Sequence, residues 1–453
     1  MKRIAILDIG KTNAKVVLLD AKTGSEIAVH RTPNRVLRDG PYPHYDIEAL
    51  WQFFLKSLTD FAQNSGFDAI SITTHGACAL LLDDTGNLAM PVLDYEHEYA
   101  PEIRSAYAGI KPPFEETFSP SLGAGLNLGA QLHYLKSSFL EQFSNVNLIL
   151  TYPQYWAYRL TGVPSVEATS LGCHTDLWLP KTGSYSPLVE SLGLEGKFPP
   201  LRSAFDVLGQ IHQDLAHKIG ISSLVPVYCG IHDSNASLLA HLLDRNPPFS
   251  VVSTGTWVVC FAVGGDLAGL DPKRDTLANV DAYGRAVPSA RYMGGREFNM
   301  MTADLASPSP SELKAVLSTV LNQALMALPS AVPGCGPYPD SVQRWVNAEY
   351  ASKAERYVAA CLYAALMTNA CLELLDADGP IIVEGPFALN SVFLEALSGF
   401  SGRDVIAVSG TTGTALGAGL LAEASKPKVK KQTYSVHQGG YKKYKNQWIS
   451  YIS

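Results

Sequence analysis

A polar segment near the N-terminus combines residue types that can bind phosphate and a divalent cation. Asp8 ends an apolar run, Gly10 follows, and the next polar residues are Lys11, Thr12, Asn13 and Lys15. Gly10 allows a tight bend without a Cβ clash, so backbone N–H groups can face an anion. Thr12 and Asn13 add donors, a lysine adds a cation, and Asp8 could hold Mg²⁺ through water. An ordinary hairpin turn is the alternative interpretation.

A segment of the same type lies in the second half of the chain. Ser253-Thr254-Gly255-Thr256 places small donors and a glycine between two apolar runs. By itself this segment could also be a plain hairpin turn. Because it occupies the matching place in the second half, we expect the two loops to clamp a polyphosphate from two sides.

A third segment, Gly230-Ile231-His232-Asp233, places an acid where a strand gives way to a helix. Asp233 could cap the helix N-terminus. Alternatively, it is a general base that accepts the proton of an attacking hydroxyl. In that role Asp233 stays ionised, while the loops and Mg²⁺ stabilise charge on the transferred phosphoryl group.

Two glycine-rich turns follow in the second half. Val383 to Asn390 has the pattern of a strand, a glycine turn and a helix start, and its candidate residues are Gly385, Pro386, Phe387 and Asn390. The backbone of such a turn can lie against an adenine ring. The other turn, Gly410 to Gly419, is more typical of close helix packing than of ligand contact.

The apolar pattern predicts the elements that position these residues. Runs at Ile4–Asp8, Val16–Asp20 and Glu26–Arg31 predict a three-strand meander. A strand, a polar turn and a strand recur at Ser250–Ser253 and Trp257–Val263, which indicates an internal duplication. Helical spacing is expected at 47–63, 126–143, 152–161 and 351–375, and an irregular stretch at 105–125.

Composition limits the class of protein. With 453 residues, 47% hydrophobic and 17% charged, the chain can fill two cores. A net charge of −7 without a basic face argues against a nucleic-acid binder. Seven cysteines without a CxxC pair fit reduced thiols. The N-terminus lacks a signal-peptide pattern, and no apolar run approaches the ~18 residues of a membrane helix. We therefore expect a cytoplasmic protein.

The last segment, from Lys426 to Ser453, carries several lysines and no acid. It could be a basic arm that contacts polyanions. We favour the alternative, a solvated tail that packs Tyr441, Tyr444 and Trp448 onto the body.

In this order and at these distances, the four segments resemble those of the FGGY carbohydrate kinases of the actin-like ATPase superfamily, over nearly the whole chain. In that family the first loop reads Asp-x-Gly-(Thr/Ala)-(Ser/Thr), the base lies in Gly-x-His-Asp-x-x-x-(Ala/Ser), and the second loop reads Ser-x-Gly-Thr. The corresponding stretches here are Asp8–Asn13, Gly230–Ser237 and Ser253–Thr256. The adenosine loop matches partly, since Glu384 replaces a first glycine and Pro386 follows Gly385.

The resemblance implies an α/β fold of two ribonuclease-H-like domains, about 1–245 for the sugar and 246–453 for ATP, with an interdomain catalytic cleft. ATP and Mg²⁺ are the implied cofactors, and Asp233 is the implied base. The implied metal positions are Asp8 and Asp233. The implied substrate contacts are His75, Gly76, Glu96, His232 and Asp233.

Within the family, the chain is most similar to the 6-deoxyketose kinases that act on L-fuculose or L-rhamnulose. Two departures fall near the sugar. His75 and Cys78 replace an aromatic residue and an aspartate, and Asp94, Glu96 and His97 occupy the region of a Trp-x-Asp-x-Arg motif. His75 could instead be a buried histidine bonded to backbone, and Glu96 could cap a loop. We expect Trp257 to be a core residue.

The predicted reaction transfers the γ-phosphoryl group of Mg·ATP to a ketose hydroxyl, at C1 by analogy with the fuculose kinases. Kinases of a pentulose, a polyol or a small hydroxy acid share this chemistry. An ATP-binding sensor of the same superfamily and an inactive paralogue are alternatives of other classes. The expected partner is a small-molecule sugar, not nucleic acid or a membrane, and a homodimer is left open.

Overall fold

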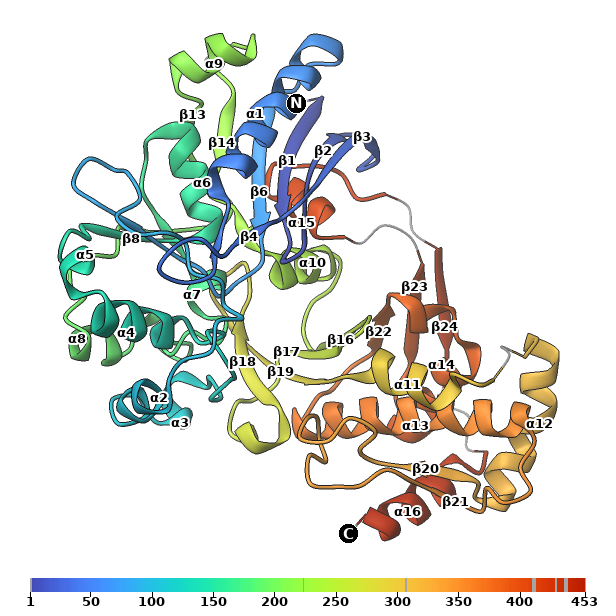
Figure 1. Cartoon of the computed structure of the whole chain (residues 1–453). Coiled ribbons are helices and arrows are strands. Elements are labelled where there is room, and N and C mark those ends of the chain that lie inside the picture. The colour runs from blue at the N-terminus through green and yellow to red at the C-terminus, as the bar shows by residue number, and fades with distance from the viewer. Residues whose placement is uncertain are drawn as a thin grey trace. The chain divides into compact units, whose positions relative to one another are not determined.

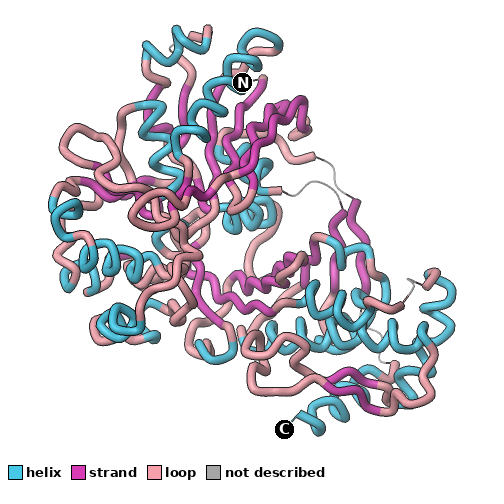
Figure 2. Tube along the Cα trace, in the orientation of Figure 1, coloured by secondary structure: helices cyan, strands magenta, loops and turns pink. Residues whose placement is uncertain are grey.

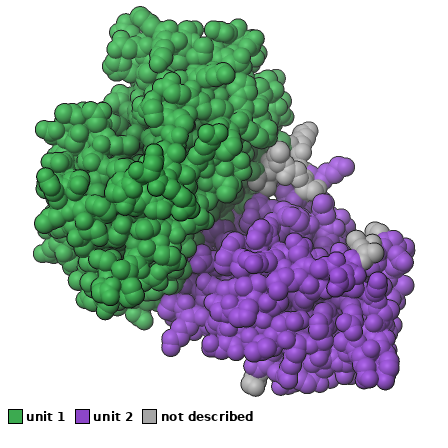
Figure 3. Space-filling view, viewed as in Figure 1, with its two compact units in different colours: residues 1–244, 278–286, 411–428 green, residues 245–277, 287–410, 429–453 purple. Residues whose placement is uncertain are grey.

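The computed structural model describes residues 2–222, 224–305, 308–409, 413–427, 430–435 and 439–452. The chain divides into two compact units (Figure 3). The first contains residues 1–244, 278–286 and 411–428, and the second contains residues 245–277, 287–410 and 429–453. Helices and strands are interspersed in both units (Figure 2), which confirms the predicted α/β class.

The sheet of the first unit brings three strand ends together. Its strand order is β13-β14-β6-β1-β2-β3, and β15 pairs with β6 (Figure 1). Strands β1, β2 and β3 form the predicted antiparallel meander, whereas β6 runs parallel to β1 and β15 parallel to β6. The carboxyl ends of β1, β6 and β15 therefore meet at one edge of the sheet. The bounds are β1 Arg3–Ile9, β2 Asn13–Asp20, β3 Glu26–Pro33, β6 Ala69–Thr74, β13 Val207–Gln210, β14 Pro226–Tyr228 and β15 Ile231–His232.

Helices pack against this sheet through apolar faces. Helix α1 (Ile47–Asn64) buries the side chains of Leu50, Phe54 and Leu58, as its 3.6-residue spacing predicts. Helices α10 (Asp233–Leu242) and α15 (Thr414–Leu421) pack closely together. The other elements of this unit are β4 Val36–Leu37, β5 His44–Tyr45, β7 Ala79–Leu82, α2 Pro101–Ala108, α3 Phe114–Thr117, α4 Leu128–Ser138, α5 Leu140–Ser144, β8 Leu148–Thr151, α6 Tyr152–Thr161, β9 Val166–Glu167, α7 Ala168–Leu171, β10 Trp178–Leu179, β11 Ser184–Tyr185, α8 Leu188–Ser191, β12 Leu201–Arg202 and α9 Gln213–Ile219.

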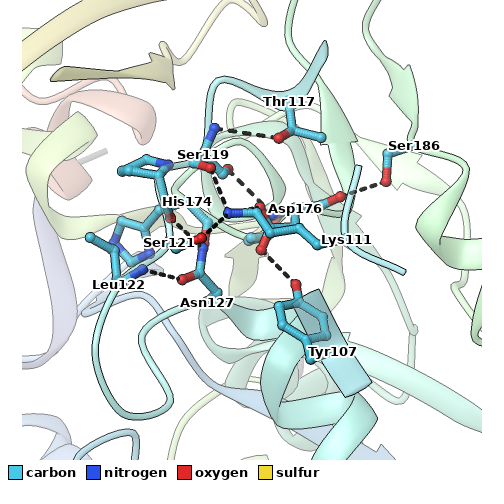
Figure 4. A network of polar contacts seen from close by, with 12 residues as sticks. Tyr107, Lys111, Thr117, Ser119, Ser121, Leu122, Asn127, His174, Asp176 and Ser186 are labelled. Atoms are coloured by element: carbon cyan, nitrogen blue, oxygen red, sulfur yellow. Dashed lines mark hydrogen bonds and ion pairs between the residues drawn. The ribbon is translucent and has the colours of Figure 1, made fainter. Parts of the chain in front are cut away.

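The irregular stretch predicted at 105–125 is held by a buried ion pair (Figure 4). Lys111 Nζ lies 3.3 Å from Asp176 Oδ1 and donates to Ser119 O and Ser121 Oγ at 3.0 and 3.1 Å. Tyr107 donates to the other carboxylate oxygen of Asp176 at 2.5 Å. The prediction holds in part, because the end of α2 and the short α3 also lie in this stretch. All three ammonium donors of Lys111 have partners, so the network ties the stretch to the body of the unit.

The second unit repeats the strand arrangement of the first. Its sheet order is β18-β19-β17-β16-β22-β23-β24. Strand β16 pairs antiparallel with β17 and parallel with β22, as β1 does with β2 and β6. This supports the predicted duplication. The bounds are β16 Phe249–Thr254, β17 Val258–Val263, η1 Pro272–Arg274, β18 Thr276–Val280, β19 Ala286–Tyr292, α11 Gly294–Thr302, α12 Pro310–Gln323, β20 Met326–Leu328, β21 Arg344–Val346, α13 Lys353–Leu374, β22 Ile381–Glu384, η2 Pro386–Leu389, α14 Ser391–Ser401, β23 Val405–Ser409, β24 Lys430–Tyr434 and α16 Tyr441–Ile452.

Helix α13 corrects one expectation from the sequence. By length and composition alone, Lys353–Leu374 is apolar enough to cross a membrane, although no run of that kind was predicted. Within the structure, 83% of its most apolar window is buried. Helix α13 forms the centre of the second unit's core, where it packs against α12, α14 and the sheet. Its apolar surface is therefore covered by protein.

The C-terminal segment packs as predicted. Tyr441, Tyr444 and Trp448 of α16 are buried in the second unit's core. The Tyr444 hydroxyl donates to Leu325 O at 2.6 Å, and Trp448 Nε1 donates to Ala327 O at 2.8 Å. These aromatic groups anchor the helix, while Lys442 and Lys443 on the same helix are exposed. This arrangement confirms the packed-tail interpretation.

Candidate active site

Strand β1 delivers Asp8 to the candidate site. The Asp8 side chain is buried, and its Oδ2 accepts from Thr414 Oγ1 at 2.5 Å and lies 3.2 Å from Lys15 Nζ. Burial raises the pKa of Asp8, and the Lys15 ammonium opposes that shift. The charge of Asp233 adds to the rise. Asp8 lies in β1 and Asp233 follows β15, two strands that end at the same edge of the sheet.

The turn after Asp8 leaves its polar side chains accessible. Gly10 N–H donates to Asn13 O at 2.9 Å, which closes the bend between β1 and β2. Thr12 and Asn13 are exposed. Asn34, missed in the sequence analysis, supports the turn by donating from Nδ2 to Gly10 O at 2.9 Å. The turn has the exposed donors that an anion-binding loop requires.

Lys11 points to a different set of partners from those expected. Its ammonium forms an ion pair with Asp94 and lies 3.4 Å from Glu96 Oε2. The rings of Tyr45 and Tyr95 lie 5.0 and 4.6 Å from it. Lys15, not Lys11, is the lysine that contacts Asp8. An ATP-binding role for Lys11 stays a prediction.

Strand β6 places His75 and Gly76 beside the same edge. The His75 ring packs against Tyr45, Tyr95 and Tyr152, with centroids 5.1 to 5.5 Å apart. Its Nδ1 lies 2.7 Å from Gly76 O, whereas its buried Nε2 has no hydrogen-bond partner among the described residues. Burial lowers the pKa of His75 to about 4, so the ring is neutral at pH 7. With Nδ1–H donating to the carbonyl, Nε2 is an unused acceptor.

Strand β15 places His232 and Asp233 at the head of helix α10. The N-cap of α10 is His232, and Asp233 is the first helical residue. Asp233 accepts from Ser234 N–H at 2.6 Å, and its Oδ1 lies 3.3 Å from His232 Nε2. The N-cap alternative is therefore wrong, because the N-cap position is taken by His232 and Asp233 already lies inside the helix, where it bonds to the amide of its neighbour Ser234. Burial raises the pKa of Asp233, and the nearby His75 opposes the shift.

Two buried residues that the sequence analysis missed position this junction. Thr169 Oγ1 accepts from His232 N–H at 3.0 Å and donates to Glu167 Oε2 at 2.5 Å. Glu167 also accepts from Thr169 N–H at 2.9 Å. Gly76 packs so closely here that a Cβ would lie 2.9 Å from His232 Nε2. No local sequence signal marks Thr169, because it lies 63 residues from its partner.

Thr169→Val is expected to lower kcat roughly tenfold, because a small displacement of Asp233 is costly in catalysis. The variant leaves a buried N–H without an acceptor, which also lowers the free energy of unfolding by about 1–3 kcal/mol. Steady-state kinetics should show the loss in kcat with little change in the KM for ATP. Thr169→Ser keeps the hydroxyl and should retain most of the activity. Equal kcat in the valine and serine variants would contradict this positioning role.

The second unit brings two predicted loops together. Thr254 Oγ1 donates to Glu384 O at 2.6 Å and accepts from Phe387 N–H at 3.1 Å. A Cβ on Gly385 would lie 2.0 Å from Thr254 O. Gly255, Thr256 and Pro386 are exposed. The buried Thr254 thus connects the two loops, and their exposed residues Gly255, Thr256, Gly385 and Pro386 lie at the ends of β16 and β22.

Three residues near these loops have mainly structural contacts. Phe387 is buried, and its ring lies 4.9 Å from that of Phe393. Asn390 caps α14 by accepting from Phe393 N–H at 3.0 Å. Trp257 is 37% exposed, with Arg291 5.1 Å above its ring, so its predicted core placement is wrong. In the Gly410–Gly419 turn, residues 410–412 lie outside the described residues, and Gly417 contacts α10 closely, as helix packing predicts.

The acids of the first unit suit a magnesium–nucleotide site. Among the described residues, no cluster of three or more His, Cys, Asp or Glu side chains could hold a metal by itself. Mg²⁺ commonly takes one or two carboxylates and completes its shell with water and substrate phosphates. Asp8 and Asp233, two carboxylates at one edge of the sheet, would fit this pattern.

Comparison with known proteins assigns both halves of the chain to one family. The N-terminal domain of the FGGY family of carbohydrate kinases matches residues 3–240, and the C-terminal FGGY domain matches residues 246–431. A solved carbohydrate kinase from Novosphingobium aromaticivorans is 34% identical, with a TM-score of 0.93, over 100% of this chain and 99% of that one.

Curated relatives are more distant. An L-fuculokinase of Haemophilus influenzae is 26% identical over 57% of this chain and 57% of its own length. An L-xylulose/3-keto-L-gulonate kinase of Escherichia coli is 25% identical over 72% of this chain and 66% of its own length. The aligned part thus spans little more than half of the first of these relatives.

Proposed function

We propose that this chain, which belongs to the FGGY family of carbohydrate kinases, transfers the γ-phosphoryl group of ATP to a hydroxyl of a ketose. The observation that carries the proposal is Asp233, accessible at the head of α10, at the same edge of the sheet where β1 delivers Asp8. A general base beside a second carboxylate is the arrangement that phosphoryl transfer to a hydroxyl needs.

The reaction follows from the roles of these residues. Asp233 accepts the proton of the sugar hydroxyl as its oxygen bonds to the γ-phosphorus, and the bond from that phosphorus to the ADP oxygen breaks. Gly10, Thr12 and Asn13 in the first unit, and Thr254, Gly255 and Thr256 in the second, orient the phosphates through short donors. Mg²⁺ held by Asp8 and Asp233 would neutralise phosphate charge. We assign sugar binding to residues 1–245 and ATP binding to residues 246–453, with Gly385, Pro386 and Asn390 near the adenosine.

The proposed acceptor is the C1 hydroxyl of a 6-deoxyketohexose such as L-fuculose or L-rhamnulose. The similarity to an L-fuculokinase supports this choice. A pentulose is the second candidate, because a relative named for L-xylulose aligns over a longer part of the chain. The unused Nε2 acceptor of His75, with Gly76 and Glu96, would contact sugar hydroxyls.

Coupled ADP release tests the proposal. The purified protein is assayed with Mg·ATP against L-fuculose, L-rhamnulose, L-xylulose, L-ribulose, D-xylulose and D-ribulose, with ATP alone and EDTA as controls. Sugar-dependent turnover that EDTA abolishes supports the kinase and identifies its acceptor. ATP binding without turnover on any sugar would instead favour the sensor or inactive alternatives.

The pH profile of kcat/KM gives an independent prediction. Asp233 accepts a proton only when it is ionised, and burial raises its pKa above 3.8. Activity is therefore present above this raised pKa and should fall about tenfold per pH unit below it. His75 and His232 have pKa values near 4, so we expect no inflection at the ordinary histidine value of 6.5. A profile that stays flat down to the ordinary aspartate value of 3.8, in protein that remains folded, would argue against Asp233 as the base.

A further inference from the structure

We propose that the sugar site selects neutral ketoses over sugars that carry a carboxylate, and that Lys11, Asp94 and Glu96 enforce this selection. We call these three residues the Lys11 clamp. This inference rests on the proposed function, because it names the substrate class of the same site.

Within the clamp, carboxylates of the protein itself neutralise the positive charge of Lys11. Its ammonium forms an ion pair with the buried carboxylate of Asp94 and lies 3.4 Å from Glu96 Oε2. Tyr45 OH lies 3.3 Å from the same ammonium and donates to Asp94 at 3.2 Å. The aromatic faces of Tyr45 and Tyr95 are also close to Lys11. The clamp thus holds one cation against two anions, so Lys11 is not a free receptor for a substrate carboxylate.

The clamp and the proposed base belong to one group of residues. The Tyr45 and Tyr95 rings that contact Lys11 also pack against His75, each with its centroid 5.5 Å from that ring. Asp233 follows His232, which pairs with Thr74 of β6, so Asp233 and His75 lie at the ends of adjacent strands. A sugar that presents one hydroxyl to Asp233 therefore has its remaining groups near His75, Tyr95 and the clamp.

The electrostatics of this group disfavour an acidic substrate. Asp94, Glu96 and Asp233 supply three carboxylates and Lys11 one ammonium, while burial keeps His75 neutral. A substrate carboxylate would meet like charges, which is unfavourable in a partly desolvated site. Hydroxyls avoid this conflict because each can donate to a carboxylate and accept from an ammonium. His75 Nε2, buried and without a partner among the described residues, adds an acceptor for one more hydroxyl.

The relatives are named for two kinds of substrate, neutral ketoses and a sugar acid. L-fuculokinase is named for a neutral ketose, whereas the Escherichia coli relative is named for L-xylulose and for the sugar acid 3-keto-L-gulonate. The Lys11 clamp predicts that this protein acts on the neutral kind. It also argues against the small hydroxy acid that the sequence analysis left open.

Paired substrates test the selection. We compare kcat/KM for L-xylulose and L-fuculose with that for 3-keto-L-gulonate in the wild type and in Glu96→Gln. The wild type should favour the better neutral ketose by about 100-fold or more, the size expected when like charges meet in a desolvated site. Glu96→Gln removes one carboxylate from Lys11 and should raise the ratio of acid to neutral activity about tenfold.

Glu98→Gln is the matched control. Glu98 lies on the same loop with nearly the same exposure, 65% against 66% for Glu96, but it pairs with Arg104 instead of Lys11. This variant removes the same charge from the loop and should leave the ratio unchanged. If Glu98→Gln shifts the ratio as much as Glu96→Gln, general loop charge sets the selectivity, and the role of the clamp is overturned. Wild-type protein that uses 3-keto-L-gulonate as well as the neutral ketoses would also overturn it.

A binding measurement tests the selection of neutral sugars independently of whether the protein is a kinase. The shift in Tm with each sugar reports binding without turnover. Stabilisation by a neutral ketose, and none by 3-keto-L-gulonate, supports the selection even if no ADP is released. Stabilisation by the acid alone would overturn the selection even if the protein is a kinase.

Discussion

Replacing Asp233 by Asn is expected to lower kcat by about 10²–10⁴-fold, the usual contribution of a general base. The amide keeps the size of the side chain but cannot take the proton of the attacking hydroxyl. Since Asp233 is partly exposed at the head of α10 and does not cap it, the fold should tolerate the change. The measurement is steady-state kcat with the preferred sugar, beside the Tm and the Kd for ATP.

Asp206→Asn serves as the comparison for Asp233→Asn. Asp206 is a partly exposed acid of the same unit, paired with Arg202 at 2.7 Å, and it has no place in the proposed site. We expect near wild-type kcat from this variant. An Asp233→Asn enzyme with comparable kcat would remove Asp233 from the reaction and leave the choice of base open.

Gly385→Ala is expected to disrupt the nucleotide loops of the second unit. Gly385 has φ +81° and ψ −164°, a region that only glycine adopts readily. A Cβ there would also lie 2.0 Å from Thr254 O and 2.8 Å from Thr254 Oγ1, so the two loops must separate. The backbone strain alone should lower the free energy of unfolding by about 1–3 kcal/mol. Displacement of the Thr254–Thr256 loop should lower kcat/KM for ATP on the order of 100-fold.

Gly402→Ala is the control that distinguishes disruption of the nucleotide loops from the general loss of stability when alanine is placed at a positive φ. Gly402 has φ +69° and ends α14, and a Cβ there meets no atom within 4 Å. This variant should lose about 1 kcal/mol of stability and keep its kcat/KM for ATP. Chemical denaturation and ATP titration measure both quantities. If Gly385→Ala lowers stability but leaves ATP kinetics unchanged, the Gly385 loop is structural only.

Local patterns predicted much of the fold. Short apolar runs closed by polar turns predicted the meander of β1 to β3, and helical spacing with a final glycine predicted α6 at its observed bounds, 152–161. The repeated strand–turn–strand pattern anticipated the shared arrangement of both sheets. One helix predicted over 126–143 is two, α4 and α5, which separate at Phe139. Its apolar spacing continues across the break, so periodicity alone does not reveal it.

The sequence by itself determined which residues could do the chemistry. Asp8, Asp233 and the glycine loops are recognisable because each motif lies within a few consecutive residues and follows a strand. The fold then brings the ends of β1, β6 and β15 to one edge, which places Asp8, His75 and Asp233 together as parallel pairing requires.

Only the tertiary structure decided the partners of these residues. Lys11 pairs with Asp94, 83 residues away; Asp8 accepts from Thr414, 406 residues away; and His232 depends on Thr169, 63 residues away. A hydrogen bond or ion pair depends on distances of a few ångströms between atoms. Local sequence patterns fix backbone conformation over a few residues, whereas those distances are set only when distant strands and helices pack.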